Sequence, residues 1–216
     1  MTILQVSNVS GGYTRKPVIK DLSFTIEEGE LVGLIGLNGA GKSTTIKHII
    51  GTLIQREGEI RLNGVTLKEN IDAYRSSFSY IPETPVLYEE LTLKEHLALT
   101  AMAYGIDEKT LAERSEKLLK EFRMEKRLNW FPSHFSKGMR QKVMIMCAFL
   151  VNPPLYIIDE PFVGLDPIAS HKLKEIMKEL CASGGAIFFS THVLEVAEKL
   201  CDRVGIINHG KLVAIG

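Results

Sequence analysis

Gly36-Leu37-Asn38-Gly39-Ala40-Gly41-Lys42-Ser43 is the stretch that decides the fold. It follows an apolar run, Leu31 to Ile35, and leads into a helix-forming segment, Ser43 to Ile50, that stops at Gly51. The stretch fits the pattern G-x-x-x-x-G-K-[ST], in which glycines let backbone N–H groups turn inward around phosphate oxygens and the helix start adds positive potential. A chance match is expected in roughly one protein per hundred or fewer. The stretch therefore predicts a strand–loop–helix unit that binds nucleotide phosphates.

The residues of this loop have separate expected roles. Lys42 would reach the β- and γ-phosphates of ATP, and the Ser43 hydroxyl would bind Mg²⁺. The alternative is an ordinary glycine turn, which the strand and the helix on either side disfavour. The candidate ATP-binding residues of the loop are Gly36, Asn38, Gly39, Ala40, Gly41, Lys42, Ser43 and Thr44.

Two adjacent carboxylates, Asp159 and Glu160, end a second apolar run. Ligands of open α/β sheets bind at this edge. Asp159 suits Mg²⁺, which is commonly held by one carboxylate, waters and phosphate oxygens. Glu160 is then placed to polarise the attacking water as a general base. Taken alone, such an acidic pair is usually a solvated strand end, but beside the glycine-rich loop it predicts a site that hydrolyses ATP.

The chain changes character twice along its length. Its first part is β-rich, with expected strands at Ile3 to Val9, Leu22 to Ile26, Leu31 to Ile35 and Gly58 to Leu62, the last being a hairpin strand with its turn at Asn63-Gly64. From about 81 to 152, helix formers recur at helical spacing, with Asp107 as a helix N-cap. The end predicts buried parallel strands at Leu155 to Ile158, Ala186 to Ser190 and Val204 to Ile207, with helices at Pro167 to Leu180 and Val193 to Leu200. The pattern indicates a helical insertion inside an α/β domain.

The bulk composition excludes several classes of protein. Acidic and basic residues balance at 26 each, so no uniformly basic surface and no nucleic-acid partner are expected. The three scattered cysteines predict buried thiols and a reducing cytosol. The N-terminus does not fit a signal peptide, and the longest apolar run, Val143 to Val151, is too short to span a bilayer. Any action at a membrane is therefore expected through a peripheral association.

The loop and the carboxylates together identify a resemblance. Over essentially all 216 residues the chain resembles the nucleotide-binding subunit of an ATP-binding cassette (ABC) transporter, most closely those of bacterial Ecs-type exporters. The resemblance implies one ABC ATPase domain of the α/β class. It would have a P-loop NTPase core with a mixed or parallel sheet and an N-terminal antiparallel β subdomain (1–80 and 153–216), and a helical signature subdomain inserted at about 81–152.

The stretch Phe135-Ser136-Lys137-Gly138-Met139-Arg140-Gln141 corresponds to the family signature, usually Leu-Ser-Gly-Gly-Gln. In this family the signature contacts the γ-phosphate held by the other subunit of a head-to-tail dimer. Ser136 and Gly138 match it, while Phe135, Lys137 and Met139 depart from it. Without this context, Ser136 is simply a helix N-cap. The resemblance therefore implies an ATP-dependent homodimer or cassette–cassette dimer that contains two composite sites.

Three more residues take roles from the resemblance. Tyr13 corresponds to the aromatic residue that stacks on adenine, although plain packing is the alternative. Asp166 belongs to the loop that links the two sites across the dimer, and before Pro167 it is also a good helix N-cap. His192 matches the switch histidine that contacts the γ-phosphate. The implied catalytic residues are Lys42, Glu160 and His192.

The sharpest departure from the family is Glu83, where a glutamine usually senses the metal-bound water. A carboxylate could also accept from that water, so the candidate metal residues are Ser43, Asp159 and Glu83; the alternative is that Glu83 is a solvated loop residue. The resemblance implies that the apolar residues between Glu83 and Leu91 receive a helix of a transmembrane permease subunit. Burial against the chain's own helices is the other interpretation.

The expected function is that of an ATP-hydrolysing subunit that powers transport, with export favoured, at the cytoplasmic face of a bacterial membrane. The rivals are a soluble ABC-type protein and a nucleotide-gated regulatory protein that hardly hydrolyses ATP. The transported substrate is not encoded here, since its selection belongs to the transmembrane subunits. Relatives usually continue beyond a strand like Lys211 to Ile215, so a further C-terminal segment is expected.

Overall fold

The computed structural model describes all residues from Met1 to Gly216, and they form two compact units. One unit comprises Met1–Tyr80, Pro153–Pro161 and Met177–Gly216; the other, the helical unit, comprises Ile81–Asn152 and Phe162–Ile176. The sequence expectation assigned 153–216 to the nucleotide-binding core as one piece. In the structure the stretch Phe162–Ile176 groups instead with the helical unit, because its residues make ion pairs there, including Lys172 with Glu121 at 2.7 Å.

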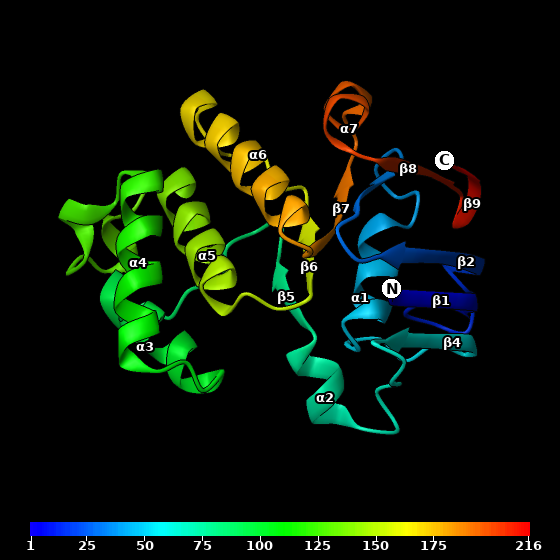
Figure 1. Cartoon of the computed structure of the whole chain (residues 1–216). Helices are drawn as coiled ribbons and strands as arrows, with labels where there is room; N and C mark the ends of the chain where they lie inside the picture. Colours follow the sequence, from blue (N-terminus) through cyan, green and yellow to red (C-terminus); the bar gives the residue numbers. More distant parts are fainter. The chain divides into compact units, whose positions relative to one another are not determined.

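A three-stranded antiparallel sheet forms the first layer of the first unit. Its strands are β1 (Thr2–Gly11), β2 (Ile19–Glu27) and β4 (Glu57–Leu62), in the order β2-β1-β4, and they lie side by side in Figure 1. Val6 pairs with Phe24 on one side and with Ile60 on the other. All three side chains are buried, so the alternation of apolar residues places one face of this sheet against the core.

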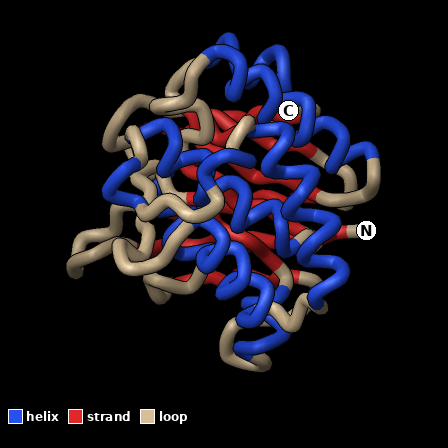
Figure 2. Tube along the Cα trace, turned by 90° about the vertical axis from the view of Figure 1, so that its left-hand side faces the viewer, coloured by secondary structure: helices blue, strands red, loops and turns tan.

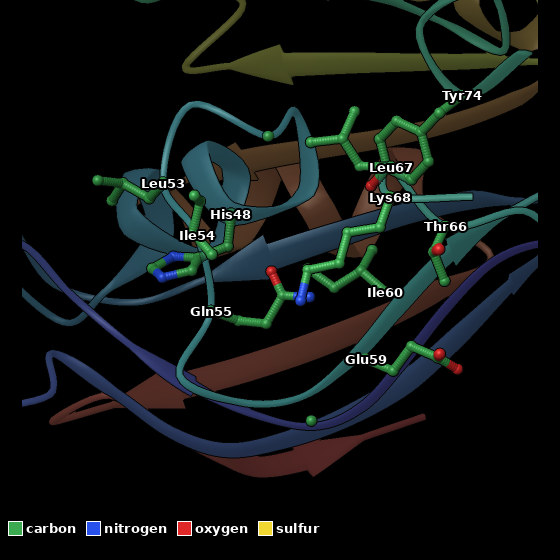
Figure 3. A pocket seen from close by; sticks show the side chains of 12 residues that line it. His48, Leu53, Ile54, Gln55, Glu59, Ile60, Thr66, Leu67, Lys68 and Tyr74 are labelled. Carbon is green, nitrogen blue, oxygen red and sulfur yellow. The ribbon is translucent and has the colours of Figure 1, made fainter. Parts of the chain in front are cut away.

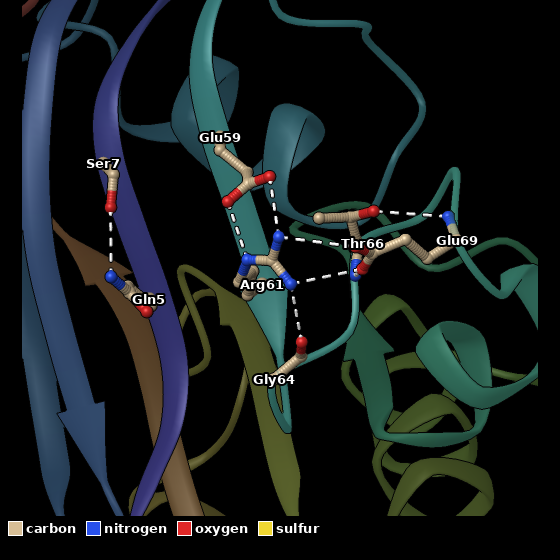
Figure 4. A network of polar contacts seen from close by, with 7 residues as sticks. All are labelled: Gln5, Ser7, Glu59, Arg61, Gly64, Thr66 and Glu69. Carbon is tan, nitrogen blue, oxygen red and sulfur yellow. Dashed lines mark hydrogen bonds and ion pairs between the residues drawn. The ribbon is translucent and has the colours of Figure 1, made fainter.

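The turn after β4 is the expected one. Asn63 and Gly64 both have positive φ, at 46° and 76°, and Leu62 and Val65 exchange backbone hydrogen bonds of 2.9 Å, as in a type I′ turn. The expected hairpin does not extend beyond the single bridge between Leu62 and Val65, because β4 pairs with β1 instead. Figure 4 shows the Arg61 guanidinium holding this region: it donates to the Glu59 carboxylate at 2.6 Å and to the Gly64 carbonyl at 2.8 Å.

The main sheet has six strands in the order β5-β6-β7-β3-β8-β9; Figure 2 draws the strands of the chain in red. β3 is parallel to β7 and β8, and β6 is parallel to β7, whereas β8 and β9 are antiparallel. Every residue of β3, β6 and β7 is buried, as their continuous apolar runs predict. The strands are β5 (Phe78–Ile81), β6 (Leu155–Asp159), β7 (Ala186–Thr191), β3 (Leu31–Ile35), β8 (Arg203–Asn208) and β9 (Lys211–Ile215).

The expectation of a fully buried strand at Val204 to Ile207 is wrong. In β8 the Ile207 side chain is buried but Ile206 is 43% exposed, because this strand lies next to the edge strand β9 and buries only one face. The buried face of β8 contacts the loop of the candidate site. Ile207 packs against the loop that begins at Gly36, as described below.

Helices α1 (Lys42–Ile49), α2 (Ile71–Ser76) and α7 (Leu194–Leu200) belong to the first unit. Helix α6 (Pro167–Ala182) begins in the helical unit and ends in the first. The helical unit contains α3 (Leu93–Ala103), α4 (Glu108–Phe122) and α5 (Lys137–Val151), with short 3-10 turns at Glu125–Arg127 and Pro132–His134. The Asp107 side chain accepts from the Thr110 N–H at the start of α4, which confirms the predicted cap. None of the helices is both long and apolar enough to cross a membrane.

The three cysteines are free thiols that are partly rather than fully buried. Burial raises the pKa of Cys147 to about 11 and those of Cys181 and Cys201 to about 12. Thiols with such values stay protonated at neutral pH and are poor nucleophiles. The expectation of structural cysteines without a disulfide framework therefore holds, with less complete burial than predicted.

A buried histidine on α1 has one unsatisfied nitrogen. His48 is 2% exposed, and its Nδ1 lies 2.8 Å from the Thr44 carbonyl, to which it donates. Its Nε2 is buried without a hydrogen-bond partner. A side chain at Gly11 would place its Cβ only 2.3 Å from that nitrogen, so β1 closes over the ring. Protonation of Nε2 would place an N–H donor without an acceptor at this buried site, so the neutral imidazole is favoured.

Acidification is therefore expected to destabilise the fold through His48. Burial lowers the pKa of His48 in the folded protein, whereas an unfolded histidine titrates at about 6.5. As the pH falls through that value the unfolded state binds more protons, so the stability contributed by neutral His48 is full above it and declines below it. Urea unfolding between about pH 5 and 6.5 measures how steeply the free energy of unfolding rises with pH. In His48→Asn this slope should be smaller than in wild type by up to about 1.4 kcal/mol per pH unit. The exposed control His171→Asn should keep that slope, and equal slopes in wild type and His48→Asn would contradict the assignment.

Candidate functional site

The loop Gly36–Ser43 connects the buried strand β3 to the start of α1. A Cβ at Gly36 would lie 2.5 Å from the Ile207 carbonyl oxygen of β8, so only glycine fits this contact. Gly41 has φ of 115° and is the N-cap of α1, a conformation that side chains disfavour. Asn38 and Gly39 at the tip are exposed, while Ala40 is buried. The loop thus presents backbone groups outward from a base fixed on the sheet.

Lys42 is buried at the base of this loop. Its Nζ donates to the Gly36 carbonyl at 2.7 Å and lies 3.6 Å from Oε1 of Glu160, with 6% of the residue exposed. Ser43 is half-buried and Thr44 buried in the first turn of α1. The structure therefore places the lysine of the loop beside Glu160, the carboxylate directly after β6, although the two are remote in the sequence.

A serine of the neighbouring strand holds the Asp159 carboxylate and the backbone of Glu160. Asp159 ends β6 and is 4% exposed, and the Ser190 hydroxyl of β7 donates to its Oδ1. The same hydroxyl accepts from the Glu160 N–H at 3.2 Å. Glu160 has φ of 50°, an unusual value for a residue other than glycine, and only 7% of it is exposed. Ser190 fixes where the chain turns after the strand, a role that the sequence analysis missed.

His192 completes this cluster. Its Nδ1 lies 3.0 Å from both carboxylate oxygens of Glu160. A carboxylate only accepts, so Nδ1 carries the proton and donates. The imidazole is about half exposed, whereas Glu160 is buried. Glu160 therefore lies between the Lys42 ammonium on one side and His192, which faces solvent, on the other.

Tyr13 lies beside α1. It is 57% exposed, its hydroxyl accepts from Lys47 Nζ at 3.0 Å, and that ammonium lies 5.2 Å from the ring centroid. The bond from Lys47 lowers the pKa of Tyr13, and a further bond with the Thr44 hydroxyl acts in the same direction. The ring is thus oriented next to the phosphate loop with much of its surface accessible.

The predicted residues of the helical unit also come together. Ser136 is the N-cap of α5, where its Oγ accepts from the Met139 N–H at 3.3 Å. A Cβ at Gly138 would lie 2.6 Å from the Gly164 carbonyl oxygen, so the loop before α6 packs directly on the first turn of α5. Asp166 N-caps α6 by accepting from the Ala169 N–H at 2.8 Å, and pairs with Lys142 at 2.9 Å.

The hydrogen bond from the Ala169 N–H and the ion pair with Lys142 both lower the pKa of the Asp166 carboxyl, and the hydrogen bond has the larger effect. The Ser136 and Asp166 caps follow from the sequence, but the partner Lys142 was missed. Lys142 lies one turn along α5 from Gly138. Its spacing in the sequence does not indicate a partner, and only the packing of the two helices brings it to Asp166.

Glu83 is exposed in the segment that follows β5. In the same segment Val86 is 74% and Tyr88 62% exposed. These two apolar side chains are therefore not buried against the chain's own helices, which was the alternative to a docking role.

A separate pocket lies at the C-terminal end of α1, the opposite end from the phosphate loop (Figure 3). His48, Leu53, Ile54, Gln55 and Tyr74 are among the residues that line it. No residue of Gly36–Ser43 belongs to this lining. The pocket is therefore distinct from the cluster around Lys42.

Comparison with known proteins agrees with this arrangement. Residues 19–163 match the family model described as ABC transporter. The chain belongs to the ABC transporter family. It is 61% identical to the ABC-type transporter ATP-binding protein EcsA of Bacillus subtilis (strain 168), over the whole of this chain and 87% of that relative. A Nod factor export ATP-binding protein I of Sinorhizobium fredii is 36% identical, over 99% of this chain and 62% of its own length.

A solved structure described as the ATP-binding subunit of an ABC transporter has a TM-score of 0.96 and 58% identity, covering 99% of this chain and 89% of its own. The α/β class, the antiparallel N-terminal sheet and the P-loop core are thereby confirmed. The chain is an ATP-binding subunit of the ABC type, a family whose members work with transmembrane permease subunits.

Proposed function

We propose that this subunit hydrolyses ATP with Mg²⁺ and thereby powers export through separate transmembrane subunits. The observation that carries the proposal is the position of Glu160, buried between Lys42 at 3.6 Å and His192 at 3.0 Å and directly after Asp159. A structural ion pair needs one partner of opposite charge. A carboxylate with a cation on one side and a solvent-facing imidazole on the other suits the activation of a water molecule.

ATP would bind through the loop Gly36–Ser43 and the start of α1. Backbone N–H groups of the loop would surround the phosphates, and Lys42 would move from the Gly36 carbonyl to the β- and γ-phosphate oxygens. The exposed ring of Tyr13 would stack on adenine. The remaining loop contacts would come from Asn38, Gly39, Ala40, Gly41, Ser43 and Thr44.

The residues present fit Mg²⁺. Ser43 and Asp159 offer hard oxygen ligands, and no group of three or more His, Cys, Asp or Glu side chains forms an all-protein metal cage. Mg²⁺ typically takes one or two protein oxygens and completes its octahedron with waters and phosphate oxygens. When bound, it would neutralise charge that develops on the phosphates.

The chain's own groups then divide the chemistry. Glu160 would accept a proton from the water that attacks the γ-phosphorus. Lys42 would stabilise charge on the phosphate oxygens, and His192 would hold the Glu160 carboxylate and contact the γ-phosphate. Positioning and electrostatic stabilisation of this kind account for most catalysis of phosphoryl transfer.

The signature is proposed to act on ATP held by a second cassette. Ser136 supplies a hydroxyl and Gly138 an unhindered N–H at the start of α5, a favourable position for an anion. Asp166 would connect the two sites across the dimer. A two-fold dimer would contain two such composite sites.

The transmembrane subunit is proposed to dock on the segment from Glu83 to Leu91, where Val86 and Tyr88 are exposed. An exposed apolar patch beside charged residues is typical of an interaction site. The subunit would thus be peripheral at the cytoplasmic face of the membrane, with no nucleic-acid partner. Similarity to a Nod factor export ATP-binding protein favours export over import.

Glu83 is expected to be replaceable. If its carboxylate accepts from the metal-bound water as glutamine does in the family, Glu83→Gln should keep Mg-ATP turnover within about tenfold, a barrier change near 1.4 kcal/mol. Phosphate release at saturating Mg-ATP measures this. A loss beyond about a hundredfold would show that the carboxylate has a distinct and necessary role.

Purification from membranes in mild detergent tests the proposed function as a whole. A transmembrane subunit should copurify, and phosphate release by the complex should stop when Mg²⁺ is chelated. The departures at Lys137 and Met139 favour one rival, a nucleotide-gated regulatory protein. A complex that binds ATP but releases phosphate no faster than its Glu160→Gln variant would support that rival.

A further inference from the structure

The segment Glu83 to Leu91 is here called the docking segment. One ion pair in the helical unit joins it to α5, the helix that begins in the signature. Arg140 Nη2 donates to Glu89 Oε1 at 2.6 Å, and Nη1 lies 3.4 Å from Oε2. The same Nη1 donates to the Pro132 carbonyl at 3.1 Å. Arg140 therefore holds both the docking segment and the 3-10 turn that leads into α5.

On the α5 side, Arg140 is directly connected to the signature. Its N–H donates to the Ser136 carbonyl at 3.0 Å, so it closes the first turn of the helix. Ser136 caps this turn, and Gly138 lies within it. Because Arg140 shares this hydrogen-bonded turn with Ser136 and Gly138, a pull on its guanidinium would act on the segment that carries the two signature groups.

On the other side, the docking segment is anchored independently of Arg140. The Tyr88 N–H donates to Nε2 of His96 at 3.0 Å, and Nδ1 of His96 donates to the Thr92 carbonyl at 2.8 Å. His96 is 6% exposed, so it ties the segment to α3. Glu89 thus sits next to a fixed backbone point, whereas the Val86 and Tyr88 side chains remain exposed.

We propose that the Glu89–Arg140 ion pair is the link through which a transmembrane subunit seated on Val86 and Tyr88 sets the position of Ser136 and Gly138. Both are positioning residues, since neither is placed on the nucleotide. The inference rests on the proposed docking role of the segment and the proposed role of the signature, and it adds how the first controls the second.

The geometry favours positioning over a contribution to stability. Glu89 is 52% exposed and Arg140 25%, and exposed ion pairs contribute little to folding. Two-point contact between guanidinium and carboxylate nevertheless fixes their mutual orientation. The Arg140 bond is also the main cause of the lowered pKa of Glu89, so the carboxylate stays charged across the physiological pH range.

Charge reversal and charge swap test the link. The variants are Glu89→Arg, Arg140→Glu and the double swap, with the charge-removing Glu89→Gln as a milder version. The matched control is the swap Glu116→Arg with Lys120→Glu, an exposed pair on α4 that has the same 2.6 Å separation. Backbone hydrogen exchange of the isolated subunit and Mg-ATP kinetics of the complex with its membrane subunit are both measured.

We expect each single variant to speed exchange in 84–91 and in 136–142 together. The double swap should restore both segments in part, because a carboxylate at position 140 re-forms the ion pair but cannot donate to the Pro132 carbonyl. In the complex, kcat should fall about tenfold with KM for ATP changed less than about twofold, because the signature acts on the transition state while the chain's own loop binds ATP. The α4 control swap should match wild type in every measurement.

Two results would overturn the link. In one, Glu89→Arg and Glu89→Gln speed exchange in 84–91 and leave 136–142 unchanged. In the other, the double swap exchanges as fast and turns over as slowly as Arg140→Glu alone, although both lack the bond to the Pro132 carbonyl. Failure of the proposed function looks different: wild type and Glu160→Gln would then have equal turnover, while the exchange measurements would still report on the ion pair.

Discussion

Replacing Glu160 by glutamine should lower Mg-ATP turnover by about a hundredfold to ten-thousandfold, the usual contribution of a general base, while ATP binding persists. The amide keeps the shape of the side chain and can still accept from Nδ1 of His192, which lies 3.0 Å from the carboxylate. It cannot take a proton from water at neutral pH. Phosphate release under saturating Mg-ATP measures the first effect, and equilibrium binding of labelled ATP measures the second.

The matched control for this variant is Glu57→Gln, which makes the same chemical change at an exposed position of β4. It should leave turnover at the wild-type value. If Glu160→Gln retains more than about a tenth of wild-type turnover, a difference of only about 1.4 kcal/mol in the barrier, Glu160 is not the base. Another group would then have to act as the general base.

Replacing Lys42 by methionine should strongly lower both ATP binding and turnover. The apolar chain of methionine fills much of the same buried space, but the cation that would reach the phosphates is lost. Removing one such preorganised electrostatic contact typically costs about a hundredfold to a thousandfold in rate. The loss also leaves Glu160 buried without the ammonium that lies 3.6 Å away, so a lower melting temperature is expected as well.

Titration with labelled ATP, phosphate release and thermal melting follow the three effects of Lys42→Met. The control is Lys211→Met, an exposed lysine on the edge strand β9, which should behave as wild type. Loss of binding separates Lys42→Met from Glu160→Gln, which should still bind. Wild-type affinity in Lys42→Met would show that the loop holds ATP without the lysine.

The features that could be predicted from the sequence are local ones. The conformation of Gly36–Ser43 follows from its glycines and its position between a strand and a helix, and the caps by Asp107, Ser136 and Asp166 depend on residues no more than three positions away. Asp159 and Glu160 were predictable as site residues because an apolar run ends at them. In each case the chain's own neighbours determine the geometry.

Two features of the structure differ from the sequence predictions, the boundary between the units and the exposure of one strand residue. Both depend on tertiary contacts. The assignment of 153–216 to one piece did not foresee that Phe162–Ile176 groups with the helical unit, because the ion pair between Lys142 and Asp166 joins residues of separate helices. The exposure of Ile206 depends on the place of β8 beside the edge strand. Neither is visible in a hydrophobic pattern, since periodicity shows which residues are apolar and not which face is covered.

The sequence by itself determined the fold class, the phosphate loop, the carboxylates and the place of the signature, because these depend on short-range backbone preferences. Only the tertiary structure decided that Ser190 holds Asp159 across 31 positions, that Glu160 lies between Lys42 and His192, and that Arg140 reaches Glu89 across 51 positions. Such pairs form where packing brings remote elements together. Spacing along the chain does not specify which side chains then meet within hydrogen-bond distance.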